Sequence, residues 1–325
     1  MLRHVIIDAQ KLKGGALILL AGVLVFSPLQ KILETIKVPT QLQDGLTIFM
    51  GVMLEALPFV LLGVLVSAFI RRFISPSTIQ RFVPKHPLLA FPVVAFLGML
   101  FPVCECGNLP VARQLIRRGM RPSQAITFLL SAPILNPAVI ISTVAAFRFM
   151  PDLVVARFAL GFLVAVLVGA YFYVRGDSDV VNAEKSTEAC EHDHTGIGSI
   201  SDELFEMVST LTLGAAIAAV IQVTIPRTVL LDLASNPVAA IATMMLLALI
   251  VSLCSNVDAF FALSFANTFS ASSLLAFLVF GPMIDIRAIA LMTRSFSPKA
   301  IALITILVAE LVFVSTLLLH HLGIL

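Results

Sequence analysis

The sequence predicts an all-α polytopic membrane protein with an inverted-topology repeat. Each half is expected to contain three spanning helices and one re-entrant hairpin, with one extra helix at the N-terminus. The prediction rests on composition, on long apolar runs and on a similarity between the two halves. Hydrophobic residues make up 59% of the 325 residues, charged residues make up 12%, and the mean hydropathy is +1.04. A soluble domain of this size needs more polar surface, whereas a bilayer removes that need.

Nine apolar segments alternate with polar stretches along the chain. They are continuous rather than alternating in hydropathy, which favours helices over strands, and most approach the roughly 20 residues of a spanning helix. The first segment is interpreted as a retained helix, because no small-residue cleavage site follows it. The segments are 14–30, 44–70, 88–103, 122–148, 152–174, 204–225, 238–253, 272–295 and 299–319.

A polar stretch over 175–203 divides the chain into two halves. It is rich in Asp, Glu, Ser and Gly, a composition typical of a solvated, flexible linker. We therefore expect an N-terminal region with the first helix over 1–43, repeat 1 over 44–174, a cytoplasmic linker over 175–203 and repeat 2 over 204–325.

The two halves resemble each other at a constant offset of 149–151 residues. Cys104 corresponds to Cys254, and "SAPILNP" from Ser131 corresponds to "FGPMIDI" from Phe280. Shared hydrophobicity alone does not produce a constant offset over about 90 residues. The pattern therefore predicts an internal repeat.

The basic residues predict the orientation. If 88–116 is a re-entrant hairpin, most Lys and Arg residues fall on the cytoplasmic side, including the cluster at 113–121. The N-terminus is then cytoplasmic, the C-terminus lies outside, and the halves are antiparallel. If 88–116 crosses the bilayer fully, the bias weakens and the chain makes nine crossings with parallel repeats. We expect the bacterial inner (plasma) membrane as the location.

A polar cluster interrupts the third apolar segment. Irregular backbone at membrane depth is tolerated only where protein or water satisfies its polar groups. The alternative is a hairpin turn with structural cysteines, but an acid such as Glu105 is costly in hydrocarbon. Asn108, followed by Pro110, predicts the capped N-terminus of a short helix. The candidate substrate-binding residues here are Cys104, Glu105, Cys106, Gly107 and Asn108.

Two further segments predict broken helices. The motif "SAPILNP" has two prolines bracketing an Asn, and "FGPMIDI" repeats the pattern in the second half. The alternative is a simple proline kink, whereas an Asn or Asp at the break is typical of a half-helix cap. The candidate binding residues are Ser131, Pro133 and Asn136 in the first half and Gly281, Pro282 and Asp285 in the second.

The segment "CSNVDAFFA" adds candidate binding residues Cys254, Ser255, Asn256 and Asp258. Asp258 and Asp285 take the places of Asn108 and Asn136, so a pseudo-twofold axis would bring all four to one central site. Loss of water favours the neutral form of a carboxyl group, which makes both aspartates candidate proton carriers. The alternative is that they only cap half-helices.

Other polar residues carry weaker signals. Glu55 and Glu310 are acids inside apolar helices and join Glu105 as candidates for proton coupling; each is also compatible with snorkelling or a structural pair. The linker motif "CEHDH" offers a weak set of metal ligands, which most simply belongs to solvated chain. These ligands are Cys190, His192 and His194.

With these motifs, the chain resembles the bacterial permease family of the YraQ and ArsP type, which contains the organoarsenical efflux permeases. The resemblance is carried by "CECGNLPVARQLIRRGM", "FLLSAPILNPAVIIST" and "FGPMIDIRAIALM", within about 45–320. It implies a polytopic permease with paired cysteines, here Cys104 and Cys106, near the pathway. One branch exports trivalent arsenicals, for which thiolates are suitable ligands. Glu105 stands where those exporters have a small residue, and favours a cation or a proton-coupled step.

The expected function is therefore a secondary transporter in the lipid bilayer that moves a small solute. Organoarsenicals and other thiophilic or metal species are candidate substrates, and proton coupling is a hypothesis. We expect no enzyme activity, no cofactor and no nucleic-acid partner; no Walker A motif is present. The alternatives are a channel, a regulatory membrane subunit and, less favoured, a thiol-redox enzyme using Cys104 and Cys106.

Overall fold

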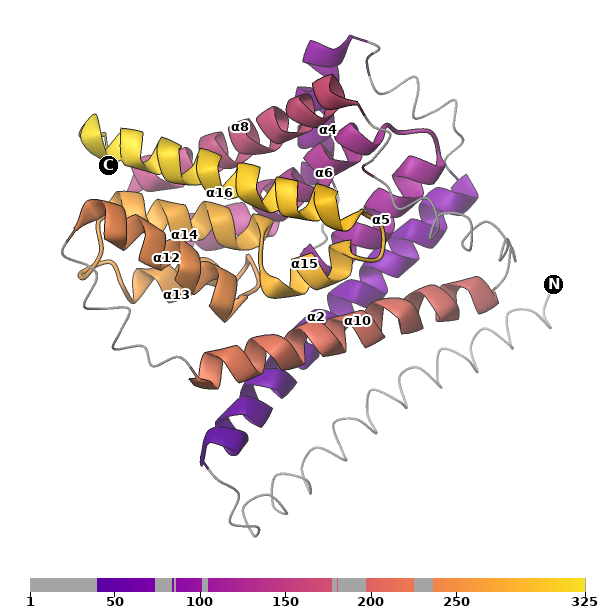
Figure 1. Ribbon diagram of the computed structural model, residues 1–325, viewed down its shortest axis with the longest axis horizontal. Coiled ribbons are helices and arrows are strands. Elements are labelled where there is room, and N and C mark those ends of the chain that lie inside the picture. The colour runs from indigo at the N-terminus through magenta and orange to yellow at the C-terminus, as the bar shows by residue number, and fades with distance from the viewer. Residues whose placement is uncertain are drawn as a thin grey trace. The chain divides into compact units, whose positions relative to one another are not determined.

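A computed structural model describes residues 40–73, 84, 86–100, 105–176, 180, 197–224 and 236–324 (Figure 1). Every regular element in these ranges is a helix. The helices are α2 (Thr40–Phe73), α4 (Pro87–Leu100), α5 (Glu105–Arg117), α6 (Pro122–Leu135), α7 (Pro137–Ala146), α8 (Pro151–Arg175), α10 (Ile197–Thr224), α12 (Pro237–Val251), α13 (Asp258–Leu263), α14 (Ala271–Met283), α15 (Ile286–Met292) and α16 (Pro298–His321).

The chain divides into two units, Met1–Ile48 and Phe49–Leu325. The described part of the first unit is the start of α2, where the Thr47 hydroxyl donates to the Gln43 carbonyl at 2.8 Å. The remaining structural results concern the second unit.

Six segments within the described residues are long and apolar enough to cross a bilayer. The chain is therefore a multi-pass helical membrane protein, as predicted. The first predicted helix, 14–30, lies outside the described residues. Two apolar helices, α4 and α12, are shorter, and the 14 residues of α4 extend about 21 Å at 1.5 Å per residue. The six spans are Leu42–Phe73, Pro122–Ala146, Pro151–Arg175, Leu204–Val223, Ala271–Met292 and Pro298–His321.

Both predicted helix breaks are present. α6 ends at Leu135, and Asn136 turns the chain into α7, where its side chain accepts from the Ala138 amide at 3.0 Å. Asp285 separates α14 from α15 in the same way and accepts from the Ala288 amide at 2.5 Å. The break in the first half falls after Pro133, which lies inside α6. The short polar side chains make the breaks by capping the helix that follows.

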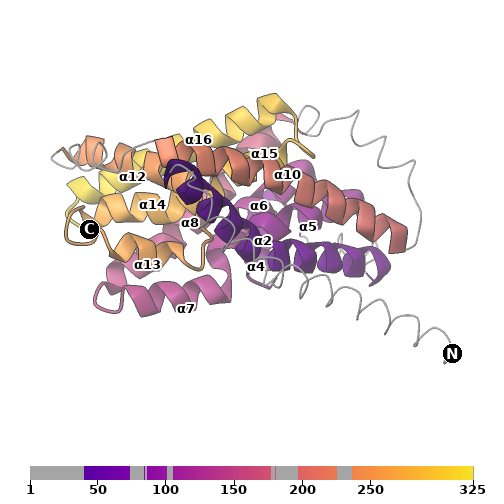
Figure 2. The same ribbon diagram turned by 90° about the horizontal axis from the view of Figure 1, so that it is seen from below.

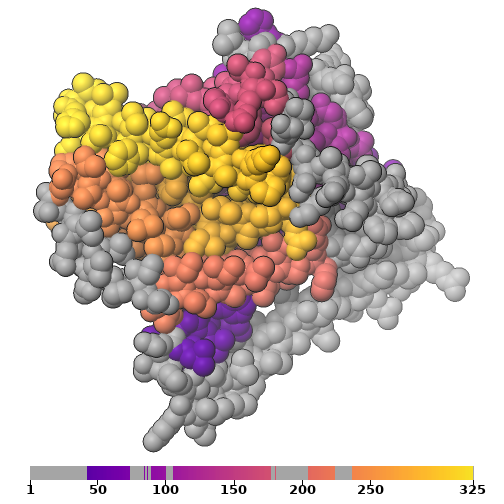
Figure 3. Space-filling view, viewed as in Figure 1, coloured from indigo at the N-terminus to yellow at the C-terminus, as the bar shows by residue number. Residues whose placement is uncertain are grey.

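The two halves have the same order of helices after their first long helix. α4, α6 and α8 contact one another in the first half, and α12, α14 and α16 do so in the second. Contacts across the halves pair α6 with α14, α8 with α16, α5 with α15, and α7 with α13 (Figures 1 and 2). On the face shown in Figure 3, α15 lies between α16 and α10.

The beginning of α5 differs from the sequence prediction. α5 includes Glu105 and runs through Pro110, so Asn108 lies within the helix rather than at its cap. The Asn108 side chain makes no hydrogen bond to any described residue and is fully buried, so the predicted capping role is wrong. The second half differs as well, since α10 begins at Ile197, inside the stretch predicted to be linker.

A close helix contact holds α5 in place. A Cβ atom on Gly63 of α2 would lie 2.4 Å from the Gly107 carbonyl oxygen. Only glycine at position 63 allows the two backbones to come this close. The contact fixes the start of α5, which carries the polar cluster.

Candidate functional site

Glu105 and Arg287 meet in the protein interior, one from each half. α5 positions Glu105 and α15 positions Arg287, and a Glu105 carboxylate oxygen lies 3.7 Å from Arg287 Nη2. Both side chains are buried. This separation is too long for a hydrogen bond, and neither oxygen of Glu105 has a hydrogen-bond partner among the described residues.

Arg287 is oriented by Asp285. Its Nε donates to Asp285 Oδ2 at 3.0 Å, while Asp285 Oδ1 accepts the Ala288 amide that caps α15. The Nη2 atom of Arg287 has no hydrogen-bond acceptor in the part of the chain that the structure describes. The group thus contains two carboxylates and one guanidinium, with the guanidinium directed mainly at one of the carboxylates.

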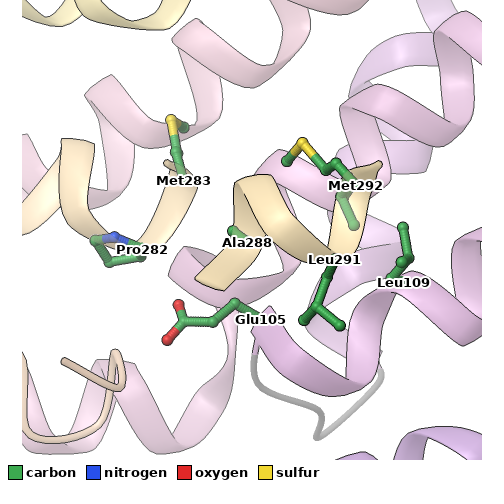
Figure 4. Close-up of a pocket in the computed structure, with 8 residues that line it drawn as sticks. Glu105, Leu109, Pro282, Met283, Ala288, Leu291 and Met292 are labelled. Atoms are coloured by element: carbon green, nitrogen blue, oxygen red, sulfur yellow. The ribbon is translucent and has the colours of Figure 1, made fainter. Parts of the chain in front are cut away.

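A small pocket opens beside the Glu105 carboxylate. Figure 4 shows this side chain reaching toward the junction of α14 and α15, where Pro282 and Ala288 lie. The rest of the wall is apolar, so Glu105 supplies the charge of the pocket. The apolar lining residues are Leu109, Leu129, Pro282, Met283, Ala288, Leu291 and Met292.

Two thiols lie near the same carboxylate. Cys106 of α5 and Cys254, in the turn that follows α12, are both buried. Both are close enough to interact electrostatically with Glu105, as are Asp285 and Arg287. The site therefore combines residues predicted from "CECGN" with residues predicted from "CSNVD" and "FGPMIDI". Cys104 lies outside the described residues.

Several buried polar atoms of the same segments lack hydrogen bonds. They include both side-chain amide atoms of Asn108, the Ser255 hydroxyl and the Asn256 carbonyl oxygen. Asn256 also places its Nδ2 4.0 Å from the Cys254 sulfur. Leaving a buried polar group unpaired costs about 1–3 kcal/mol. These atoms lie in segments that the sequence predicts to bind the substrate.

A second charged group joins α8, α7 and α13. Arg157 Nη2 donates to Asp258 Oδ2 at 2.6 Å, with the two side chains 0% and 3% exposed. Arg157 Nη1 donates to the Thr143 hydroxyl at 2.8 Å. Asp258 therefore has its own guanidinium partner, separate from the Glu105 group.

A third charged group is partly exposed. Arg113 of α5 contacts Glu206 of α10 at 3.1 Å, and Arg294 lies 4.0 Å from the same carboxylate. Arg113 also donates to the Ser295 hydroxyl and the Arg294 carbonyl, each at 3.0 Å. This group joins α5 to α10 and to the segment after α15.

The remaining predicted site residues are distributed as follows. Ser131, Pro133 and Asn136 are buried, and the Ser131 hydroxyl donates to the Phe128 carbonyl at 3.3 Å. Gly281 is partly buried and Pro282 lines the pocket. Glu55 is half-buried, whereas Glu310 is exposed on α16. Cys190, His192 and His194 lie outside the described residues.

The sequence prediction missed the roles of Arg157 and Arg287. The charge count placed Arg157 outside and Arg287 at the cytoplasmic side, whereas both are buried in the protein against carboxylates. Neither therefore reports which side of the membrane its segment faces. An Arg seven residues into a 25-residue apolar helix was the available signal for Arg157. Within the described residues, no three His, Cys, Asp or Glu side chains form a metal-binding group.

Comparison with known proteins identifies the family. A family model described as "Predicted permease" (ArsP_1) matches residues 41–321. The chain belongs to this family. It is 36% identical over 280 residues to "UPF0718 protein YcgR" of Bacillus subtilis, covering 84% of this chain and 95% of that protein.

A second relative is named as a subunit of a membrane permease complex. The chain is 34% identical over 274 residues to the "Putative two-component membrane permease complex subunit" of Streptococcus mutans. The match covers 81% of this chain and 90% of the relative. No solved structure matches the chain significantly. The predicted family is thus confirmed, and the arrangement around Glu105 is a candidate permease site.

Proposed function

We propose that the protein is a secondary transporter that moves a small solute across the bacterial inner (plasma) membrane through a site at Glu105. The observation that carries the proposal is a buried carboxylate that has no hydrogen bond to any described residue. It lies at a contact between the two halves, in a chain of a permease family. A buried acid without hydrogen bonds is costly to keep, and an acid inside a membrane protein commonly marks a functional site.

An inverted repeat is part of the proposal. The common order of helices supports it, as do the reciprocal contacts of α5 with α15 and of α7 with α13. The lengths of α4 and α12 support re-entrant segments, because about 21 Å is less than the roughly 30 Å of the hydrocarbon core. In this arrangement the N-terminus is cytoplasmic and the C-terminus lies outside.

Proton coupling is assigned to Glu105 in preference to the two aspartates. Asp258 is paired with Arg157 at 2.6 Å, and Asp285 is paired with Arg287 at 3.0 Å while also capping α15. Both aspartates therefore already have a hydrogen-bonded guanidinium as a partner. Glu105 is the acid of this site without a hydrogen-bonded cation, and so the one best suited to exchange a proton.

The thiols give the proposal its first substrate candidates. Cys106 and Cys254 lie near Glu105, and thiolates bind thiophilic metal and metalloid species well. Organoarsenicals are one class of such substrates. The name of the Streptococcus relative favours a second candidate function, that of a membrane subunit working with a partner.

The test is transport by the full chain in everted membrane vesicles, with trivalent methylarsenite, arsenite, silver and zinc ions as probes. We expect gradient-driven, saturable accumulation of at least one probe, abolished in Glu105→Gln and weakened in Cys106→Ser. Asp152→Asn, which changes an exposed acid in the first turn of α8, is the control and should transport normally. Counterflow of labelled against unlabelled probe separates a carrier from a channel. Equal transport by Glu105→Gln and the control would refute the assignment of Glu105.

A further inference from the structure

Arginines gather where the ends of four helices meet. Arg118, directly after α5, donates through Nη2 to the Arg71 carbonyl at the end of α2. The guanidinium of Arg121, at the start of α6, lies 5.2 Å from the ring centroid of Tyr173, near the end of α8. Only two residues separate Arg118 from Arg121, so these contacts bring the four helix ends together. We call this group the arginine cluster, and its members are Arg71, Arg72, Arg117, Arg118, Arg121 and Arg175.

The cluster carries charge of one sign. The described segments that contain it, 64–73, 114–124 and 164–176, have six arginines and no Asp or Glu. Glu206 of α10 reaches α5 at Arg113, which lies one turn before the cluster, and pairs there at 3.1 Å. Charge of one sign at a surface attracts ligands of the opposite sign. The cluster members whose side chains are exposed are Arg72, Arg117, Arg121 and Arg175.

The cluster lies at the ends of membrane spans. Three of the six candidate spans begin or end beside its arginines. The same helix end holds Tyr171 and Tyr173, the two tyrosines of a chain that has no Trp. Tyr residues and basic residues next to a span are typical of the headgroup level of a bilayer. The cluster is therefore at the depth of the lipid headgroups. The three spans are Leu42–Phe73, Pro122–Ala146 and Pro151–Arg175.

The opposite end of α8 differs in charge. Arg148 is exposed just before the helix, and Asp152 lies in its first turn, so positive and negative charge are mixed there. The 25 residues of α8 extend about 38 Å at 1.5 Å per residue, which is enough to place its two ends at opposite faces of the bilayer. Arg148 is therefore a suitable control for the arginine cluster.

We propose that the arginine cluster binds the headgroups of anionic phospholipids. A guanidinium can donate two parallel hydrogen bonds to one phosphate group, and each Arg near a membrane surface adds attraction to anionic lipid. Because the arginines come from four helix ends, bound lipid engages α2, α5, α6 and α8 together. α5 carries Glu105 at its other end, so the lipid also helps to hold the helix of the candidate site. The proposal does not depend on the transport function.

The test is lipid binding to the purified full-length protein in detergent, with individual lipid-bound states resolved by native mass spectrometry. Phosphatidylglycerol is the anionic probe, and phosphatidylcholine with the same acyl chains is the zwitterionic comparison. We expect phosphatidylglycerol to bind at least about tenfold more tightly. Arg72→Gln/Arg175→Gln removes two exposed arginines and should weaken phosphatidylglycerol binding about 30-fold, because each Arg near the surface contributes about fivefold.

Matched variants separate charge from folding. Arg72→Lys/Arg175→Lys keeps both charges and should retain most of the binding. Arg148→Gln removes an exposed arginine at the other end of α8 and should bind phosphatidylglycerol as the unmodified protein does. Thermal unfolding followed by circular dichroism checks that each variant is folded. In the same assay, phosphatidylglycerol should raise the unfolding temperature of the unmodified protein more than phosphatidylcholine does.

Several results would overturn the proposal. They are equal binding of the two lipids, unchanged binding in the double glutamine variant, or an equal loss in Arg148→Gln. A lysine variant as weak as the glutamine variant would also overturn it, because its charges are intact. Soluble glycerol 1-phosphate at millimolar concentration carries the phosphate without acyl chains and should not displace the lipid. Displacement by this probe would show a site for soluble phosphate esters instead.

Discussion

Replacing Asp258 with Asn should destabilise the protein strongly, because it leaves Arg157 charged and buried. The pair is 2.6 Å apart and the guanidinium is 0% exposed. Two unit charges about 4 Å apart at an effective dielectric constant of about 20 interact with about 4 kcal/mol. Measured losses on breaking such buried pairs are about 3–5 kcal/mol. We expect a loss in this range for Asp258→Asn.

The remaining partner of Arg157 cannot compensate for the loss. Thr143 already accepts from Nη1 at 2.8 Å, and Arg157 Nε has no hydrogen-bond partner among the residues described in the unmodified protein. An amide at position 258 offers one neutral acceptor in place of a carboxylate. The double variant Arg157→Met/Asp258→Leu removes both charges and should recover most of the stability, because buried pairs are often replaceable by apolar residues.

The assay is reversible unfolding of the purified protein in mixed micelles, followed by circular dichroism. We expect the order of stability to be the unmodified protein, then the double variant, then Asp258→Asn. The exposed Glu310→Gln variant serves as the baseline for an acid that has no buried partner. If Asp258→Asn is as stable against unfolding as the unmodified protein, or if the double variant is no more stable than Asp258→Asn, the reasoning is wrong.

Three further predictions concern packing and polar groups. Gly63→Val should destabilise the protein by about 1–3 kcal/mol in the same unfolding assay, because the added Cβ would lie 2.4 Å from the α5 backbone. Gly51→Ala is the control and should leave the stability unchanged, because a Cβ at position 51 would have no described atom within 4 Å. Asn108→Leu should retain or increase the thermal stability, because it removes a buried amide that has no hydrogen bond among the described residues. The same variant should reduce transport in vesicles at least tenfold. A loss of stability would contradict this prediction. Glu206→Gln should lower the free energy of unfolding in urea by less than about 1 kcal/mol, because the ion pairs of Glu206 with Arg113 and Arg294 are partly exposed. A loss above about 3 kcal/mol would contradict this and show that Arg113 needs the Glu206 carboxylate to stay in place.

The sequence predicted the parts of the fold that depend on local pattern. Continuous apolar runs located the long described helices, but not α5 or α13, because a spanning segment must satisfy its own backbone and meet lipid. The breaks at Asn136 and Asp285 were also predictable, since a short polar side chain next to proline or in an apolar run caps a new helix. Even there, the position of the first break was displaced from Pro133.

The partners of the buried charges were not predictable. Asp258 pairs with Arg157, which lies 101 residues away, and nothing in either local sequence selects the other. Asp285 and Arg287 are neighbours, but their contact depends on α15 being covered by α10 and α5 rather than facing water. The meeting of Asn108, Asn136, Asp258 and Asp285 stays a prediction, and in the structure each aspartate pairs with its own guanidinium.

Asp285 divides its two oxygens between two tasks. Oδ1 holds the first turn of α15, and Oδ2 holds Arg287. The guanidinium can therefore swing toward Glu105 without unravelling the helix that carries it, since the capping oxygen is not the one released. A change of protonation or of cargo at Glu105 would then alter the tether between α5 and α15 while both helices stay intact. Rigid helices joined by an adjustable electrostatic link are well suited to move as bodies past one another.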